Sequence, residues 1–400
     1  MYQHQLGGNK FTQGLTVAAF SLGRVVASPY LGAWSETKGS KHILSLTSLI
    51  VAGGTLLNAY APSCAVLIAA QLVTGVGSGT LGVTRSYVTE RTRGAEKTWK
   101  LARLTAVQYA GFTVTPCVGA FYAHALGDKA FWAGPIRVTS FSLASYTLAL
   151  LALVLYGCLQ TVFVDYVPAR DRPKKPTPPT PTPSEAVSAV EFEVEARKDL
   201  NVCGLLAWSE VDWCLLAGLA LNVATKSAVG VFETVGIPVA KQRFGVSAAV
   251  AGYSVSLCGA FGVALLACGM KPLAERFHDA TLMAAGVAGM AVSCALVMSP
   301  HTTLAVYLGA VFTMYGAGYP IGHTTVLTWF SKLSTQSSQG FLQGWFASAG
   351  SFGRIVLPAL AGLVAEFEGY GTLFAGLGGF LALTCVAIAI NYARFVRLAK

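Results

Sequence analysis

Apolar residues along the chain gather into long runs that are separated by short polar segments. A helix needs about 20 apolar residues to cross a hydrocarbon layer about 30 Å thick. On that template the runs predict eleven membrane-spanning helices, near residues 12–34, 42–61, 64–88, 101–126, 138–163, 212–238, 247–270, 280–299, 302–327, 341–364 and 370–392. The pattern therefore predicts an all-α membrane protein whose two termini lie on opposite sides of the bilayer.

Composition favours the same class of protein. The 400 residues are 54% hydrophobic and only 12% charged, whereas soluble domains carry about a quarter of their residues as charges. The net charge of +10 would suit nucleic acid, but most of the 28 Lys and Arg residues lie in one set of alternate loops and at the C-terminus. Basic loops stay cytosolic. We therefore expect a cytosolic C-terminus, a lipid bilayer around the protein and no nucleic-acid partner.

The longest polar segment, residues 164–211, divides the predicted spans into five and six. It holds the proline-rich stretch Pro173–Pro183 and then the acidic run Glu185–Asp199. Proline-rich segments of this kind are stiff, solvated spacers. We expect an N-terminal bundle over residues 1–163, a cytosolic linker, and a C-terminal bundle over residues 212–400. A PxxP ligand for a partner domain is the alternative reading of the linker.

Signatures of catalysis and of metal binding are missing from the sequence. It has no Gly-Lys-Ser/Thr phosphate loop, no HExxH pair and no GxSxG elbow. The nine cysteines are scattered without a CxxC pair, which argues against a disulfide framework or a zinc site. We therefore expect neither an enzyme nor a bound metal or cofactor, and transport driven directly by ATP is disfavoured.

A loop motif gives the first resemblance to a known family. Gly32–Lys41 resembles the signature between helices 2 and 3 of the major facilitator superfamily, with Glu36 at the acidic position and Lys38 among the basic ones. The resemblance implies a fold of two helical bundles in which the first visible span is helix 2. The chain would then show 11 helices of a 12-helix fold lacking helix 1, and Met1 would be an internal or misassigned start.

A second resemblance covers most of the chain. It is similar to the subfamily of lysosomal membrane proteins associated with ceroid lipofuscinosis, through an ordered succession of motifs: Ala27–Gly32, Gly75–Gly79, Arg85–Tyr87, Phe232–Thr234, Gly316–Pro320, Gln339–Gly340 and Gly344–Arg354. The resemblance implies a monomeric transporter of a small molecule or ion in a lysosomal or vacuolar membrane.

Two arginines lie half-way along predicted spans, where a charge is costly and therefore a functional hypothesis by default. In the fold that the chain resembles, both helices border the interface between the bundles, where substrate binds near the midplane. We expect Arg24 and Arg354 to bind substrate, together with Tyr319 on the cavity-lining helix that Pro320 kinks. Binding of the arginines to backbone carbonyls of a neighbouring helix is the alternative.

The acids near the spans suggest two further roles. Glu233 is the most deeply placed acid and is the candidate proton carrier, because burial favours the protonated carboxyl. A luminal gate or a helix-cap contact is the alternative for Glu233. Glu36, Lys38, Arg85 and Glu90 lie together at the cytosolic ends of their spans. They fit an ion-pair latch that closes the cytosolic side, and topology-setting surface charge is the alternative.

The balance of charge inside the spans predicts the sign of the substrate. Arg24, Arg85, Lys226 and Arg354 outnumber the single embedded acid Glu233, which we expect to be too distant to neutralise the arginines. Arginine bonds two oxygens of an anion at once. The expected function is secondary active transport of a small solute, anionic in charge, by alternating access. A channel-like anion pathway on the same fold and a non-transporting membrane scaffold are the alternatives.

Overall fold

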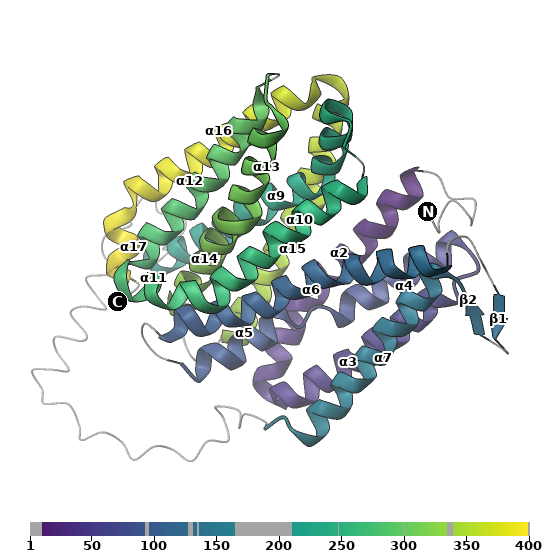
Figure 1. The fold of residues 1–400 in the computed structure, drawn as a ribbon. Helices are drawn as coiled ribbons and strands as arrows, with labels where there is room; N and C mark the ends of the chain where they lie inside the picture. The colour runs from purple at the N-terminus through teal and green to yellow at the C-terminus, as the bar shows by residue number, and fades with distance from the viewer. Residues whose placement is uncertain are drawn as a thin grey trace, which may run out of the picture.

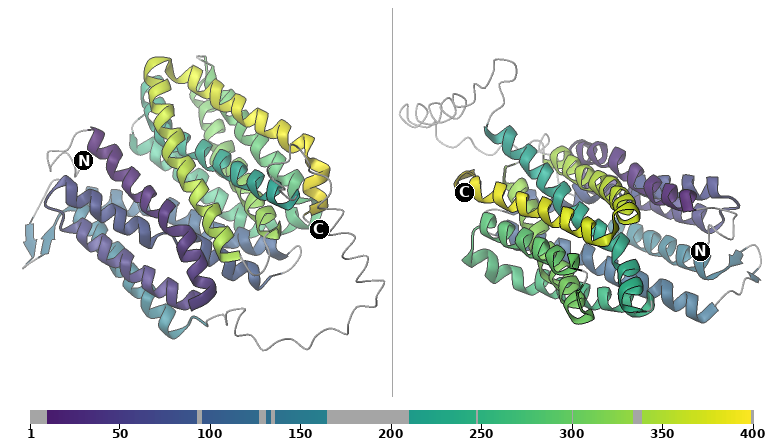
Figure 2. Two further views of the ribbon diagram at one scale, coloured as in Figure 1. Left: turned by 180° about the vertical axis from the view of Figure 1, so that it is seen from behind. Right: turned by 90° about the horizontal axis from the view of Figure 1, so that it is seen from above.

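The computed structural model describes residues 10–92, 96–126, 131–133, 136–164, 210–246, 248–299, 301–333 and 339–398. The proline-rich stretch and the acidic run of the predicted linker lie outside the described residues. The described helices gather in two groups, one from residues before the linker and one from residues after it (Figure 1 and Figure 2).

The first group contains the helices before the linker. They are α2 (Lys10–Lys38), α3 (Ser40–Ala59), α4 (Cys64–Gly77), α5 (Leu81–Glu90), α6 (Glu96–Leu126) and α7 (Ser140–Thr161). A short antiparallel hairpin, β1 (Phe131–Ala133) and β2 (Ile136–Val138), joins α6 to α7. This hairpin was not predicted, because strands of three residues leave no periodic pattern in the sequence.

The second group follows the linker. Its elements are α9 (Glu210–Phe244), α10 (Ala248–Ala264), the π-helical turn η1 (Leu265–Gly269), α11 (Met270–Arg276), α12 (Asp279–Met298), α13 (Leu304–Phe312), the π-helical turn η2 (Thr313–Gly318), α14 (Tyr319–Leu333), α15 (Gln339–Phe367), α16 (Gly369–Ile390) and α17 (Tyr392–Leu398). Trp329 Nε1 donates a hydrogen bond of 3.1 Å to the Phe395 carbonyl and so ties α17 to α14.

Several helices begin where the sequence supplies a capping hydroxyl. The Ser63 side chain accepts the Val66 N–H at the start of α4, and Thr303 does the same for α13. Thr139 and Ser142 form a reciprocal capping box at the start of α7. These hydroxyls satisfy backbone N–H groups that the first turn of a helix leaves free. Helix starts at the polar ends of the spans are therefore fixed locally by the sequence.

Within the described residues, nine helical spans are long and apolar enough to cross a membrane. Large apolar side chains such as Leu257 (73% exposed) and Ile390 (77% exposed) face outward, as a protein surrounded by lipid requires. Helices α2 and α6 occupy two more of the eleven predicted spans but are not among the nine. The all-helical membrane architecture is confirmed, and the prediction of eleven spans is not tested by these nine.

The span over Cys64–Glu90 is broken in the middle. Helix α4 ends at Gly77 and α5 begins at Leu81, so Ser78, Gly79 and Thr80 form a turn at membrane depth. Backbone outside a helix is tolerated at this depth only where protein or water covers it. The break lies against α2, which packs along both pieces. It therefore marks the interior of the molecule.

Candidate functional site

At one end of the molecule, α2 meets the first residues of α15. The Glu36 carboxylate accepts a hydrogen bond of 3.1 Å from the backbone N–H of Phe341. Because the first N–H groups of a helix lack partners and carry partial positive charge, Glu36 caps α15 across the two halves of the chain. Partial burial raises the pKa of Glu36, and the Phe341 N–H opposes the rise. We call this end, where Lys38, Glu90 and Gln339 lie, the latched end.

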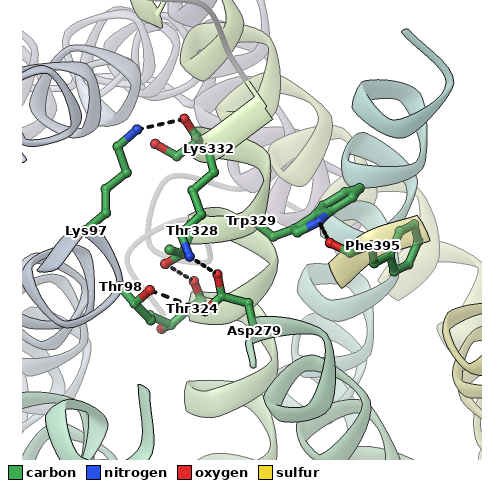
Figure 3. A network of polar contacts seen from close by, with 9 residues as sticks. Lys97, Thr98, Asp279, Thr324, Thr328, Trp329, Lys332 and Phe395 are labelled. Carbon is green, nitrogen blue, oxygen red and sulfur yellow. Dashed lines mark hydrogen bonds and ion pairs between the residues drawn. The ribbon is translucent and has the colours of Figure 1, made fainter. Parts of the chain in front are cut away.

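A second set of polar contacts joins the two groups at the latched end, around Asp279 (Figure 3). Thr98 on α6 donates a hydrogen bond of 3.2 Å to Asp279 Oδ1, and the Lys332 ammonium lies 2.6 Å from Oδ2. Lys97 donates to the Ser331 carbonyl over 3.2 Å. Burial lowers the pKa of Lys97, and the neighbouring Lys332 ammonium lowers it further. Asp279 is therefore held by one partner from each half of the chain.

Between these two sets of contacts, glycines let the helices touch backbone to backbone. Gly32 on α2 faces Gly340 on α15, and a Cβ on either glycine would overlap the other backbone. A Cβ on Gly82 of α5 would lie 2.8 Å from the Gly344 Cα. Side chains do not fit at this distance, so only glycine permits the approach. The latched end is closed by backbone contact as well as by polar bonds.

Half-way along α2, Arg24 reaches the broken span. Its Nε donates a hydrogen bond of 3.1 Å to Ser78 Oγ in the turn between α4 and α5. The guanidinium carbon also lies 4.8 Å from the centre of the Phe20 ring, a favourable cation–π distance. Arg354, half-way along the neighbouring α15, is close enough to repel Arg24 electrostatically. The two predicted substrate arginines are therefore brought together from different halves of the chain.

Arg354 also forms an ion pair with Glu233 on α9. The side chains are 21% and 36% exposed, respectively, so the pair is in contact with the interior space and is not sealed within the core. The expectation that Arg354 lies far from any carboxylate is therefore wrong. Helix α9 packs along α15 and places Glu233 opposite Arg354, a tertiary relationship that spacing along α9 alone does not reveal.

Three further basic side chains, those of Arg85, His323 and Lys226, lie inside the molecule near this ion pair. Arg85 on α5 is 1% exposed, and its guanidinium nitrogens have no hydrogen-bond partner among the described residues. It lies 5.6 Å from the centre of the Phe346 ring. His323, stacked on Tyr319 with ring centres 5.1 Å apart, likewise has no partner among the described residues for either ring nitrogen. Lys226 is near enough to be repelled by Arg85.

A cavity of about 310 Å³ opens beside the ion pair, between α6, α9, α10 and α13. Glu233 is one of its lining residues, and most of the others are apolar or aromatic. The Tyr109 hydroxyl crosses from the first group of helices to donate to the Tyr315 carbonyl over 3.0 Å, and the Tyr307 hydroxyl donates to the Gly236 carbonyl over 2.7 Å. Both hydroxyls are therefore hydrogen-bonded to backbone carbonyls, and the two aromatic rings line the cavity.

Comparison with known proteins gives this arrangement a family. The family model of the Major Facilitator Superfamily matches residues 1–270 and 215–397, nearly the whole chain. The chain belongs to the major facilitator superfamily. It is therefore a multi-pass membrane protein of a transporter family, as the loop motifs predict.

Individual relatives agree with this assignment. The chain is 26% identical to the major facilitator superfamily domain-containing protein 8 of Xenopus laevis, over 96% of this chain and 84% of the relative. Among solved structures, it superposes on the human organic anion transporter MFSD10 (TETRAN) with a TM-score of 0.71 at 18% identity, over 94% of this chain and 83% of that one. It superposes on the proton:xylose symporter XylE with the same TM-score at 14% identity, over 94% and 85%. The structural likenesses show a shared fold.

The structure of this major facilitator protein gathers some of the predicted site residues and separates others. Arg24, Arg354 and Glu233 lie together, and Tyr319 is within electrostatic reach of Arg354 and Arg85. Among the residues of the predicted latch, Arg85 turns inward against Phe346 without a hydrogen-bond partner among the described residues, while Glu36 caps α15. Lys38 is exposed and Glu90 half-buried at the helix ends beside this cap.

Asp279 was not singled out in the sequence, although it is 7% exposed and central to the latched end. The available signal is its place: it follows the basic residues Lys271 and Arg276 in a loop between two spans, as Glu36 lies among basic residues in the first half.

Proposed function

We propose that this major facilitator protein is a secondary active transporter of a small anionic solute. The observation that carries the proposal is that Arg24 and Arg354, on the neighbouring helices α2 and α15, lie within electrostatic reach of each other, and that Glu233 pairs with Arg354. Two guanidinium groups beside one carboxylate give this partly exposed interior a positive potential, which attracts anions. An anion entering from the open side would compensate it.

The route of transport is alternating access between the bundles of residues 1–163 and 212–400. The excess of basic residues supports a cytosolic position for the latched end and the C-terminus, so the conformation described here opens away from the cytosol. Helices α2 and α6 complete eleven spans. We propose a monomer in a lysosomal or vacuolar membrane, supported by the motif resemblance described above.

Arg24, Arg354 and Tyr319 are the proposed substrate-binding residues, and Glu233 is the proposed proton carrier. Protonation of Glu233 would release Arg354 from the ion pair, so the arrangement supports linkage between proton and substrate binding. Glu36, with the neighbouring Lys38, Glu90 and the buried Arg85, is proposed to control the cytosolic gate. The printed roles of the structural neighbours, an organic anion transporter and a proton:xylose symporter, support both an anionic substrate and proton coupling as chemistry available to this fold.

Uptake into proteoliposomes tests the proposal. We expect saturable, counterflow-capable uptake of an anion that Arg354→Gln abolishes and Arg354→Lys restores only in part, since Lys lacks the two-pronged geometry of Arg. Arg276→Gln, which removes an exposed cation on α11, is the control and should transport normally. Unsaturable flux without counterflow would favour a channel, and absence of anion flux in the wild-type protein would contradict the proposed function.

A further inference from the structure

We propose that the cavity beside Glu233 holds the apolar body of an amphipathic organic anion, whose acidic group replaces the Glu233 carboxylate on Arg354. The inference rests on the proposed function and narrows its substrate to a class. It assigns a binding role to a part of the molecule outside the predicted arginine and tyrosine site.

The size and lining of the cavity point to an apolar ligand. Its volume of about 310 Å³ lies at the lower end of the range for small-molecule sites, which are mostly apolar with few polar groups. The walls include Phe232, Val255, Val311 and the ring faces of tyrosines. An inorganic ion or a sugar would leave these surfaces without an apolar partner. A hydrocarbon body of a few carbons would remove them from water.

The charged residues around the cavity indicate whether the ligand carries an acidic or a basic group. Glu233 is the one Asp, Glu, Lys, Arg or His among the lining residues described, and Arg354 neutralises it. Lys226 and Arg24 are near enough to Arg354 to experience its repulsion. A cation approaching Glu233 would meet the field of all three cations, whereas an anion would be attracted by it. The ligand is therefore an anion.

Glu233 and the ligand cannot both occupy Arg354 as carboxylates, because two like charges would share one cation. Glu233 must first take a proton from the solution on the open side, and the ligand's anionic oxygens then accept the Arg354 N–H bonds. The groups that face Glu233 are Arg354 on α15, Lys226 on its own helix, and three phenols. These phenols belong to Tyr109 on α6, Tyr315 on η2 and Tyr319 on α14. One proton and one monoanion thus bind together.

Alkanesulfonates are suitable probes because they stay anionic across the working pH range. For the purified wild-type protein, we expect the affinity for methane-, butane- and hexanesulfonate, measured by calorimetry, to rise about fourfold per buried methylene. Binding should strengthen as the pH falls from 8 to 5, with the sign set by proton uptake on Glu233. Hexylamine and hexanol, which match the chain but not the charge, should not bind.

Variants separate the cavity from the arginine. Val255→Trp fills the cavity and should remove the dependence on chain length, while Leu257→Trp, two residues away on the same helix and 73% exposed to the outside, should leave it intact. Glu233→Gln frees Arg354 permanently and should bind hexanesulfonate more tightly than the wild type at pH 8, with no further gain as the pH falls. Arg354→Gln should not bind the sulfonates. The unfolding midpoint of each variant establishes that it is folded.

The outcomes distinguish the two proposals. Sulfonate binding that is independent of chain length in the wild type, or binding of hexylamine in its place, would overturn the inference while leaving anion transport through Arg354 intact. Equal pH dependence in the wild type and in a folded Glu233→Gln protein would also overturn it. Failure of the wild type to bind or transport any anion would overturn the proposed function itself.

Discussion

Thr98 on α6 donates its hydroxyl hydrogen to Asp279 on α12, over 3.2 Å and across the two halves of the chain. The contact parallels the one between Glu36 and the Phe341 N–H. In both, an acid at the end of a helix in its own half, Glu36 in α2 and Asp279 in α12, holds the first turn of a helix from the other half. The latched end therefore has two acidic clasps, each of which crosses the interface.

The first prediction concerns the Asp279 clasp. Asp279→Asn leaves the partly buried Lys332 ammonium without its counter-charge, and loss of one partner of a buried ion pair costs up to about 3 kcal/mol. We expect faster amide hydrogen exchange over residues 96–101 and a lower unfolding midpoint. Glu275→Gln, which changes an exposed acid on α11, is the control. Unchanged exchange in Asp279→Asn would show that Asp279 does not hold the latched end closed.

The second prediction concerns the Glu36 clasp. Glu36→Ala removes the acceptor of the Phe341 N–H. It should destabilise the closed latched end by about 1 kcal/mol, the usual contribution of a helix cap. Glu36→Gln keeps an acceptor oxygen but loses the interaction of its charge with the helix dipole, so its effect should be smaller. Hydrogen exchange at the Phe341 amide measures both. Equal exchange in the wild type and Glu36→Ala would contradict the cap.

Sequence patterns predicted the spans better than the features that interrupt them. The predicted boundaries at 42–61 and 280–299 lie within two residues of α3 and α12, because hydropathy and end-capping are local. The break at residues 78–80 and the π-helical turn η2 were missed, because contacts with neighbouring helices stabilise them. The pairing of Glu233 with Arg354 was missed for the same reason: it depends on how α9 lies against α15.

The third prediction tests the glycine contact. A methyl group on Gly344 would overlap the backbone of Ser28 and Pro29 on α2, so Gly344→Ala should hold the latched end apart. Gly362→Ala on the same helix places its methyl in open space and is the matched control. Hydrogen exchange over residues 28–36 should increase in Gly344→Ala alone. If the two variants show the same hydrogen exchange, the close approach of α2 and α15 at Gly344 is not required to keep the latched end closed.

The fourth prediction concerns the free-energy cost of burying the Arg85 charge. Replacing buried ionic side chains by apolar ones of similar volume is often neutral or stabilising, by about 1–4 kcal/mol for ion pairs. Arg85→Met should therefore raise the unfolding midpoint or leave it unchanged, while anion uptake falls at least tenfold. Arg276→Met, at an exposed site, should change neither quantity. A strongly destabilised Arg85→Met would indicate that Arg85 is a structural residue with satisfied bonds.

The contact of α2 and α5 with the glycines of α15 has a consequence for how fast the molecule can change state. Interlocked side chains must leave their holes before two helices separate, which makes a tightly packed interface resistant to motion. Gly32, Gly340 and Gly344 offer no such holes, so the two backbones can part without any rotamer having to change. The resistance to opening at the latched end then comes mainly from the polar bonds that cross it, those of Glu36, Asp279, Lys97 and Thr89.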